Sequence, residues 1–93
     1  MDPKTLVRAA RDHLKSQPAF ALDVALAALY WMARGEGYEL TGADVAAAGE
    51  HATAAAAALG TGALVRERIA ANVAGDGPAA RWARQCLGFD AGR

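Results

Sequence analysis

The first hydrophobic positions of the chain repeat at the spacing of an α-helix. Leu6, Ala10 and Leu14 follow one another at intervals of four residues, which places them in one apolar stripe. Asp2, with a proline after it, is a typical N-cap and first-turn pair. The pattern therefore predicts a helix that begins after Asp2 and runs to about residue 16.

The next hydrophobic run has apolar residues on two opposite faces of a helix. Phe20 and Trp31 lie on one of these faces, and only Asp23 and Tyr30 form a narrow polar seam. A helix that is apolar nearly all round is typical of the centre of a fold. We therefore expect a central helix over about residues 18–34 that is covered on both sides.

A capping box predicts the start of a third helix. Thr41 and Asp44 stand three residues apart, so each side chain can bind the backbone N–H of the other. In the helix that follows, five residues recur at steps of four and three, like the seam of a coiled coil: Val45, Gly49, Ala52, Ala56 and Leu59. Because most of these residues are small, two helix backbones can approach closely along the seam.

Glycines separate two further helices from the third. One is expected over about residues 63–74, with an apolar face made of Val65, Ile69 and Val73. A short last helix begins at Pro78, where its apolar side lies opposite Arg81 and Arg84. The pattern as a whole predicts an all-α bundle of about five helices.

The composition agrees with this fold class and places it in one domain, residues 1–93, with residues 88–93 expected to be frayed. Of the 93 residues, 50 are hydrophobic, and 26 of these are alanine, which favours helix over sheet. Alanine contributes little buried area to a core. We therefore expect a thin core that is helped by a second copy, as in a homo-oligomer, or by a docked partner protein.

The formal net charge is zero, which gives no bulk attraction to nucleic acid or to an anionic membrane. The charge is unevenly distributed, however: residues 1–34 carry +2, residues 35–65 carry −4 and residues 66–93 carry +2. We expect the basic ends to fold over the acidic middle or to face water. Complementary association between copies is the alternative interpretation.

Nucleic-acid binding is an alternative function that the charge distribution disfavours. No Lys or Arg occurs between Arg34 and Arg66, so the helix after the best-marked linker has no cation for phosphates. The remaining basic candidates are Arg66, Arg68, Arg81 and Arg84. They could form one basic patch of a nucleic-acid-associated regulator, although Glu67 and Asp76 lie among them.

A single cysteine and the N-terminal charges indicate a cytoplasmic protein. Cys86 cannot form an internal disulfide. The basic residues before the apolar run at 19–33 resemble a signal peptide, but Asp12 and Asp23 are incompatible with one. The same run is shorter than the roughly 20 residues that span a membrane. We therefore predict a buried helix of a soluble protein.

No set of residues supports catalysis or metal binding. His13 and His51 each stand next to an acid, but neighbours in sequence do not face each other on a helix, and neither HExxH nor a pair of cysteines is present. We expect His13 to be a satisfied core or interface histidine, and His51, which shares a helix face with Asp44, to be exposed. Cys86 has no nominated base, so we expect it to pack as a small apolar residue. No enzyme activity and no cofactor are predicted.

Several short motifs resemble the C-terminal helical region of a larger family of uncharacterised bacterial proteins. These motifs are Gly37-Tyr38-Glu39, Thr41-Gly42-Ala43-Asp44-Val45, Arg66-Glu67-Arg68-Ile69 and Leu87-Gly88. The resemblance covers roughly residues 18–88, and the family members carry a long helical hairpin ahead of it. It implies a helical fold and a stand-alone version of that region, and it implies no activity or site residues.

We expect the protein to act through protein contacts, most simply as a homodimer or as a docked module. The aromatic candidates for contact are Trp31, Tyr38 and Trp82. The charged candidates are Arg66, Arg81 and Arg84, and their possible partners in another copy are Glu36 and Glu39. A groove of small residues near Tyr30, Trp31 and Tyr38 that holds a small apolar ligand is the remaining alternative.

Overall fold

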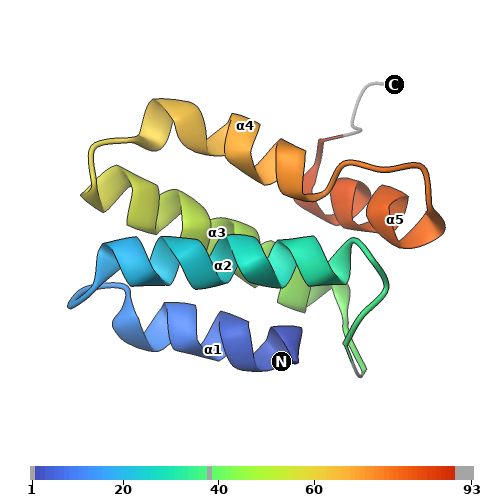
Figure 1. The fold of residues 1–93 in the computed structure, drawn as a ribbon, viewed down its shortest axis with the longest axis horizontal. Helices are drawn as coiled ribbons and strands as arrows, with labels where there is room; N and C mark the ends of the chain where they lie inside the picture. The colour runs from blue at the N-terminus through green and yellow to red at the C-terminus, as the bar shows by residue number, and fades with distance from the viewer. Residues whose placement is uncertain (1, 38, 90–93) are drawn as a thin grey trace.

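Five α-helices make up the computed structural model, which describes residues 2–37 and 39–89 (Figure 1). In chain order they are α1 (Pro3–His13), α2 (Pro18–Met32), α3 (Gly42–Ala58), α4 (Gly62–Asn72) and α5 (Pro78–Leu87). The described residues contain no strand. The all-α prediction is therefore confirmed.

The helices α2 and α3 form a central pair, around which the other three pack (Figure 1). α1 contacts both members of the pair along one edge, and α4 contacts both along the opposite edge. α5 lies against the end where α2 finishes and α3 begins. The result is a flat molecule with extents of 35, 28 and 17 Å, and Figure 1 looks onto its broad side.

The helices start where the capping signals of the sequence place them. The Asp2 carboxylate accepts a hydrogen bond from the Lys4 N–H at 2.9 Å. At the start of α3, the Asp44 carboxylate accepts from the Thr41 N–H at 2.9 Å and the Thr41 hydroxyl accepts from the Asp44 N–H at 3.3 Å. α1 ends at His13, somewhat earlier than expected, because a turn follows it.

Three helices end in the same glycine-containing turn. After α2, the Glu36 N–H donates to the Trp31 carbonyl, and Gly35 has a φ of 82°. The corresponding glycines after α3 and α5 are Gly60 and Gly88, with φ of 78° and 80°. This Schellman arrangement needs a left-handed residue, which glycine adopts without a Cβ clash. The chain therefore reverses sharply after each of these helices.

Alanine dominates the core. Of the twenty buried hydrophobic residues in the described chain, eleven are alanines. The predicted seam of α3 is buried at Val45, Gly49, Ala52 and Ala56, which lets α2 and α3 approach closely. Leu59, the last residue of the seam, is 40% exposed because it caps the C-terminus of α3 and lies in the following turn.

The monomer closes its own core. Its accessible surface of 5304 Å² is close to the value of about 5,100 Å² that a monomeric protein of this mass shows. Among the described residues, no buried side-chain nitrogen or oxygen lacks a hydrogen-bond partner. The surface area and the hydrogen bonding of the single chain are thus those of a folded monomer.

The central position of α2 is confirmed, but its expected burial on both sides is wrong. Phe20 and Trp31, which the sequence places on a covered face, are 43% and 41% exposed. α1 and α4 occupy the two edges of α2 and α3 lies behind it, so no described helix covers the side that faces the viewer in Figure 1. Four short neighbouring helices cover the back and the edges of α2 and leave its front open.

Candidate functional site

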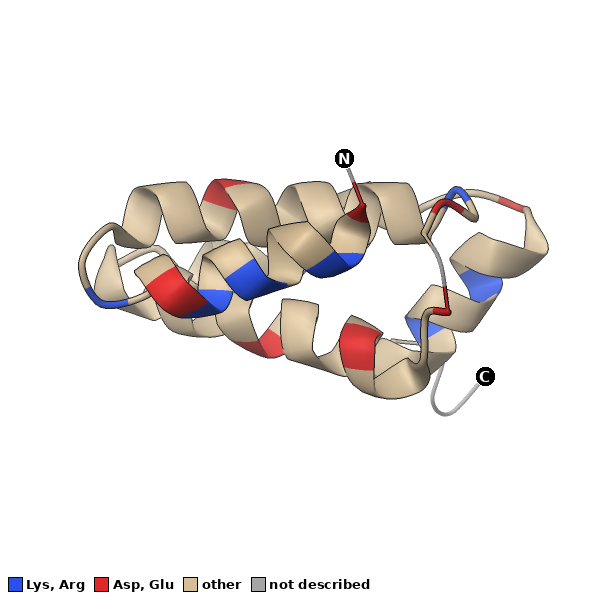
Figure 2. Ribbon diagram, turned by 90° about the horizontal axis from the view of Figure 1, so that it is seen from below, with Lys and Arg blue, Asp and Glu red and all other residues tan. Residues whose placement is uncertain are grey.

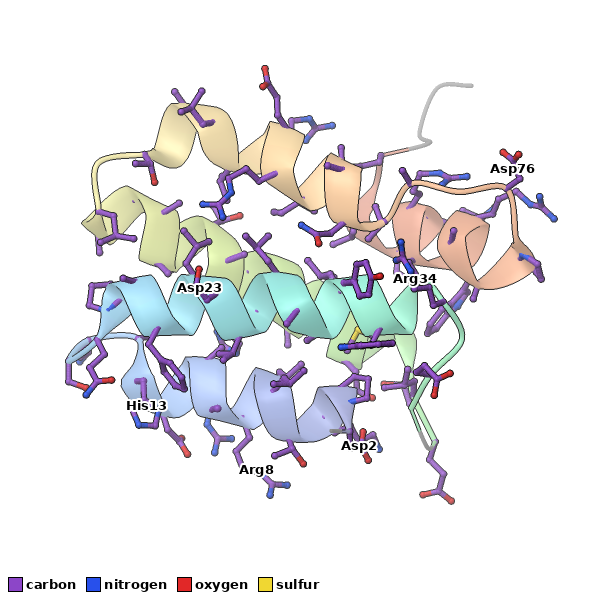
Figure 3. The ribbon with its side chains drawn as sticks, in the orientation of Figure 1. Asp2, Arg8, His13, Asp23, Arg34 and Asp76 are labelled. Atoms are coloured by element: carbon purple, nitrogen blue, oxygen red, sulfur yellow. The ribbon has the colours of Figure 1, made fainter. Side chains whose placement is uncertain are left out.

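The open side of α2 carries a cluster of aromatic and charged side chains, which we call the α2 face. It consists of Phe20, Asp23, Ala27, Tyr30, Trp31 and Arg34. Steps of three and four residues place these positions on one side of the helix. In Figure 3, Asp23 and Arg34 lie near opposite ends of α2. The face therefore has an acidic half, a basic half and an apolar centre.

Contacts within the α2 face hold its C-terminal half in one conformation. The Arg34 guanidinium lies 3.5 Å from the centre of the Tyr30 ring, and its Nη1 donates to the Tyr30 carbonyl at 2.9 Å. The Tyr30 and Trp31 rings meet edge to face, with centroids 5.0 Å apart. These three exposed side chains are therefore ordered by one another in the monomer.

The N-terminal end of the α2 face is supported by α1. The Phe20 ring meets the His13 ring edge to face, with centroids 5.1 Å apart. His13 is half-buried, and its Nδ1 lies 2.9 Å from the Ala9 carbonyl oxygen. His13 is thus the satisfied histidine that the sequence predicts, and it fixes the position of Phe20.

Two arginines that the sequence predicts to pair with acidic residues of another copy donate hydrogen bonds to carbonyls of their own chain. Arg84 donates from Nη1 to the Val73 carbonyl at 2.9 Å and to the Gly75 carbonyl at 3.0 Å. Arg81 donates to the Asp76 carbonyl. These carbonyls follow the end of α4, where backbone oxygens have no helical partner. Both arginines therefore bind the connection between α4 and α5, and their expected place in an interface stays a prediction.

The remaining predicted contact residues that the structure describes lie on α2 itself, in the loop after α2, on α4 and on α5. Glu36 and Glu39 are exposed in the loop between α2 and α3, and Tyr38 lies outside the described residues. Trp82 is half-buried and packs against the core from α5. Of the three aromatic candidates, Trp31 is the one that the structure places on an open surface.

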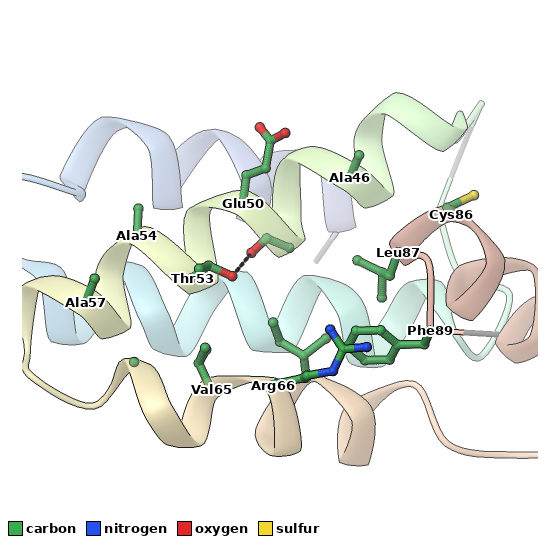
Figure 4. A pocket seen from close by; sticks show the side chains of 13 residues that line it. Ala46, Glu50, Thr53, Ala54, Ala57, Val65, Arg66, Cys86, Leu87 and Phe89 are labelled. Carbon is green, nitrogen blue, oxygen red and sulfur yellow. Dashed lines mark hydrogen bonds between the residues drawn. The ribbon is translucent and has the colours of Figure 1, made fainter. Parts of the chain in front are cut away.

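A groove of about 740 Å³ runs between α3 and α4 and is closed at one end by the residues that follow α5 (Figure 4). Its lining is mostly small or apolar: Ala46, Gly49, Glu50, Thr53, Ala54, Ala57, Gly62, Val65, Arg66, Ile69, Cys86, Leu87 and Phe89. The Arg66 guanidinium lies 4.5 Å from the centre of the Phe89 ring. Tyr30 and Trp31 do not line it, so the expected small-residue groove exists at a different place from the one predicted.

Phe89 and Leu87 are groove residues that the sequence reasoning missed. Residues 88–93 were assigned to a frayed end, whereas Phe89 packs against the core and its N–H donates to the Arg84 carbonyl at 2.9 Å. Residues 90–93 lie outside the described chain. The signal that identifies the turn is an apolar residue on each side of Gly88, which is typical of a Schellman motif.

A smaller cleft of about 410 Å³ between α1 and α3 is lined by the three basic residues Lys4, Arg8 and Arg11 of α1. It is lined by Lys4, Val7, Arg8, Arg11, Asp44, Ala47 and His51. Lys4 Nζ lies 4.0 Å from the Asp44 carboxylate, and Figure 2 shows the basic positions of α1 on the side toward α3. Lys4 thus contacts the acidic middle of the chain, whereas Arg8 and Arg11 are exposed, so both branches of the expectation occur at this end. His51, expected to be exposed, is half-buried in this cleft.

Three of the four arginines of the nucleic-acid alternative contact uncharged groups of the chain. Arg81 and Arg84 bind carbonyls, and Arg66 packs on Phe89. Arg68 alone among the four has no side-chain contact with another described residue. The structure adds no support to this alternative.

The described residues offer little reactive chemistry. They contain no group of three or more His, Cys, Asp or Glu side chains that could hold a metal ion. Cys86 is a free, half-buried thiol, and a Cβ built on Gly42 would lie 3.4 Å from its Sγ, so it packs closely on the start of α3. None of the helices in the described parts of the chain is both long and apolar enough to cross a membrane.

Comparison with known proteins adds no relative. No family model, no curated protein and no solved structure matches the chain. The resemblance to a bacterial family therefore stays a prediction from the sequence motifs. The function has to be argued from the two surfaces of this molecule, the α2 face and the groove between α3 and α4.

Proposed function

We propose that the protein is a non-enzymatic self-association module that forms a homodimer through the α2 face. The main support is the exposure of three aromatic side chains, Phe20, Tyr30 and Trp31, on a single helix. Trp and Tyr dominate the binding energy of protein interfaces because they bury a large apolar area with few rotatable bonds. No reaction is assigned to the protein.

The order already present in the α2 face favours binding. Arg34, Tyr30 and Trp31 contact one another in the monomer, as described above. Side chains that are ordered before association lose less conformational entropy when a partner arrives. The exposed aromatic surface is therefore preorganised for contact.

The charges of the α2 face favour a second copy of the same chain as the partner. Asp23 and Arg34 are separated by eleven residues, which is about 16 Å along a helix. In a two-fold interface, the same patch meets itself in reverse. An antiparallel pair of α2 helices would place Asp23 of each copy near Arg34 of the other. Ala27, between them, is small enough to let the two helices approach closely.

A dimer through the α2 face would use the broad side of the molecule around it. The broad side of the molecule measures 35 Å by 28 Å, and α2 runs along its long direction (Figure 1). A stable interface buries about 800 Å² on each partner. Because the monomer completes its own core, we expect a reversible dimer that dissociates to folded monomers.

Light scattering and sedimentation velocity over a wide range of protein concentration test this proposal. We expect the wild-type mass to rise from one chain to two, and Trp31→Ala to weaken dimerisation at least tenfold, which corresponds to about 1.4 kcal/mol. Leu64→Ala is the matched control, since Leu64 is the most exposed large hydrophobic residue at 56% but lies on α4. This control variant should dimerise like the wild type.

Charge reversal tests the antiparallel arrangement. Asp23→Arg and Arg34→Asp should each weaken the dimer, because each places two like charges opposite one another. The double variant should recover the dimer, because residues 23 and 34 of the two copies again carry opposite charges. Failure of the double variant to recover association would rule out the antiparallel pairing. A wild-type protein that stays monomeric at every concentration would refute self-association itself.

A further inference from the structure

The groove between α3 and α4 has the size and the lining of a ligand site. Its volume of about 740 Å³ falls within the range of roughly 300–1,000 Å³ that is usual for such sites. Five of its lining residues have no side chain beyond Cβ: Ala46, Gly49, Ala54, Ala57 and Gly62. The lining residues of α3 from Ala46 to Ala57 span eleven residues, or about 16 Å, and the Leu87 side chain lies over Gly49 within this stretch. The part of the groove beyond Leu87, toward Ala57, can therefore hold an apolar chain.

Polar groups of α3 do not compete for this apolar space. The Thr53 hydroxyl donates to the Gly49 carbonyl at 2.9 Å, so its hydrogen-bonding capacity is used within the helix. Glu50 lies on the rim, and Figure 4 shows its carboxylate directed away from α4. The interior of the groove is left to alanine and glycine together with the largely buried Val65 and Ile69.

One cation lines this groove, and it has no acidic partner. The Arg66 guanidinium rests on the Phe89 ring, where Figure 4 shows it between α3 and α4. The ion pairs of the described residues are Lys4 with Asp44 and Arg11 with Asp12, so no described carboxylate neutralises Arg66. A guanidinium beside an aromatic ring keeps its N–H groups available for a carboxylate, which it can bind through two parallel hydrogen bonds.

We propose that this groove binds an alkyl carboxylate, with the hydrocarbon chain along the small residues of α3 and the carboxylate on Arg66. Charge complementarity selects the ligand class: an apolar body matches the alanine and glycine lining, and one negative charge matches the single unpaired cation. The site is independent of the α2 face, since the two surfaces share no residue.

Two quantitative expectations follow for the affinity of alkyl carboxylates. Each added methylene that enters the groove should tighten binding about fourfold, because burying one CH₂ contributes about 0.8 kcal/mol. This gain should stop when the chain exceeds the length of the groove. A carboxylate should bind at least tenfold more tightly than the alcohol with the same chain, because the alcohol cannot form a charged pair with Arg66.

Isothermal titration and thermal shift with a series of saturated alkyl carboxylates, each below its micelle concentration, measure these effects. The full-length protein is used, with alkyl alcohols and alkyl trimethylammonium ions of matched length as probes. Arg66→Gln should remove the preference for the carboxylate while keeping the affinity for the alcohol. Arg68→Gln is the control on the same helix, since Arg68 does not line the groove.

A second pair of variants tests the apolar part of the site. Ala57→Leu places a larger side chain in the groove and should weaken both the carboxylate and the alcohol at least tenfold. Ala58→Leu changes the neighbouring exposed residue, which does not line the groove, and should leave both unchanged. Both substitutions introduce a good helix former at an exposed helical position, so both variants should fold.

The possible results of these titrations either establish the site or overturn it. Saturable binding of one carboxylate per chain, weakened at least tenfold in Arg66→Gln and Ala57→Leu but unchanged in the two controls and in Trp31→Ala, would establish the site. No saturable binding would overturn it, as would equal effects of Arg66→Gln and Arg68→Gln. Equal affinity for the trimethylammonium probe would also overturn it, because the charge selectivity would then be absent.

Discussion

Substitution of Arg84 tests how α5, the short last helix, is attached to the rest of the molecule. Its guanidinium binds the Val73 and Gly75 carbonyls at 2.9 and 3.0 Å, and so joins α5 to the end of α4. The bond to Val73 is half-buried and contributes about 1.5 kcal/mol, whereas the exposed bond to Gly75 contributes about 0.5 kcal/mol. We therefore expect Arg84→Ala to lower the free energy of unfolding by about 2 kcal/mol.

Thermal unfolding followed by circular dichroism measures this loss. For a chain of this size, 1 kcal/mol corresponds to a change in Tm of about 4–8 °C, so Arg84→Ala should unfold roughly 8–16 °C below the wild type. Arg84→Lys keeps the charge but cannot reach both carbonyls with one planar group, and it should lose about half as much. Arg68→Ala is the control, because Arg68 is exposed and its side chain makes no hydrogen bond to a described residue.

The same experiment distinguishes an internal role of Arg84 from a role in an interface. An internal role lowers Tm equally at all protein concentrations, whereas an interface role makes the loss depend on concentration. The reasoning is refuted if Arg84→Ala and Arg68→Ala unfold at the same temperature. It is refuted equally if the loss disappears on dilution.

Two further substitutions test the packing and the capping of α3. A Cβ on Gly49 would lie 2.6 Å from Leu87 Cδ2, the end of a flexible side chain that has to shift. Gly49→Ala should therefore gain less than the roughly 1 kcal/mol of its better helix propensity, and a Leu87→Ala background should restore the full gain in a double-mutant cycle by urea unfolding. Thr41→Ala should cost about 1 kcal/mol in the same assay because it removes the capping box. Thr53→Ala, whose hydroxyl binds only the Gly49 carbonyl of its own helix, is the control and should cost less than half of that.

Most of the local structure was predictable from the sequence, because it depends on neighbouring residues. Asp2 and the Thr41–Asp44 pair mark helix starts through hydrogen bonds that span two or three residues. Gly35 and Gly60 mark helix ends because only glycine adopts the left-handed turn without strain. The seam of α3 is visible as a repeat of small residues. These signals fix the number and the order of the helices.

The candidate surfaces were harder to predict, because they depend on residues far apart in the chain. Apolar periodicity shows that Phe20 and Trp31 share a side of α2, but it does not show whether another helix covers that side. Arg84 looks like a surface charge until α4 ends beside it and offers two carbonyls without partners. This internal role of Arg84 depends on the position of α4, which the sequence does not show.

The sequence by itself determined that this chain forms five helices and where these helices are capped. It also determined that the side chains along the seam of α3 are small enough for close packing. The tertiary structure decided which apolar faces are covered. α1 and α4 pack on opposite edges of the α2–α3 pair, so the front of α2 stays open and a groove with Arg66 on its rim lies between α3 and α4. Helix formation is set by local hydrogen bonds and propensities, whereas the open surfaces follow from how few short helices are available to cover the central pair.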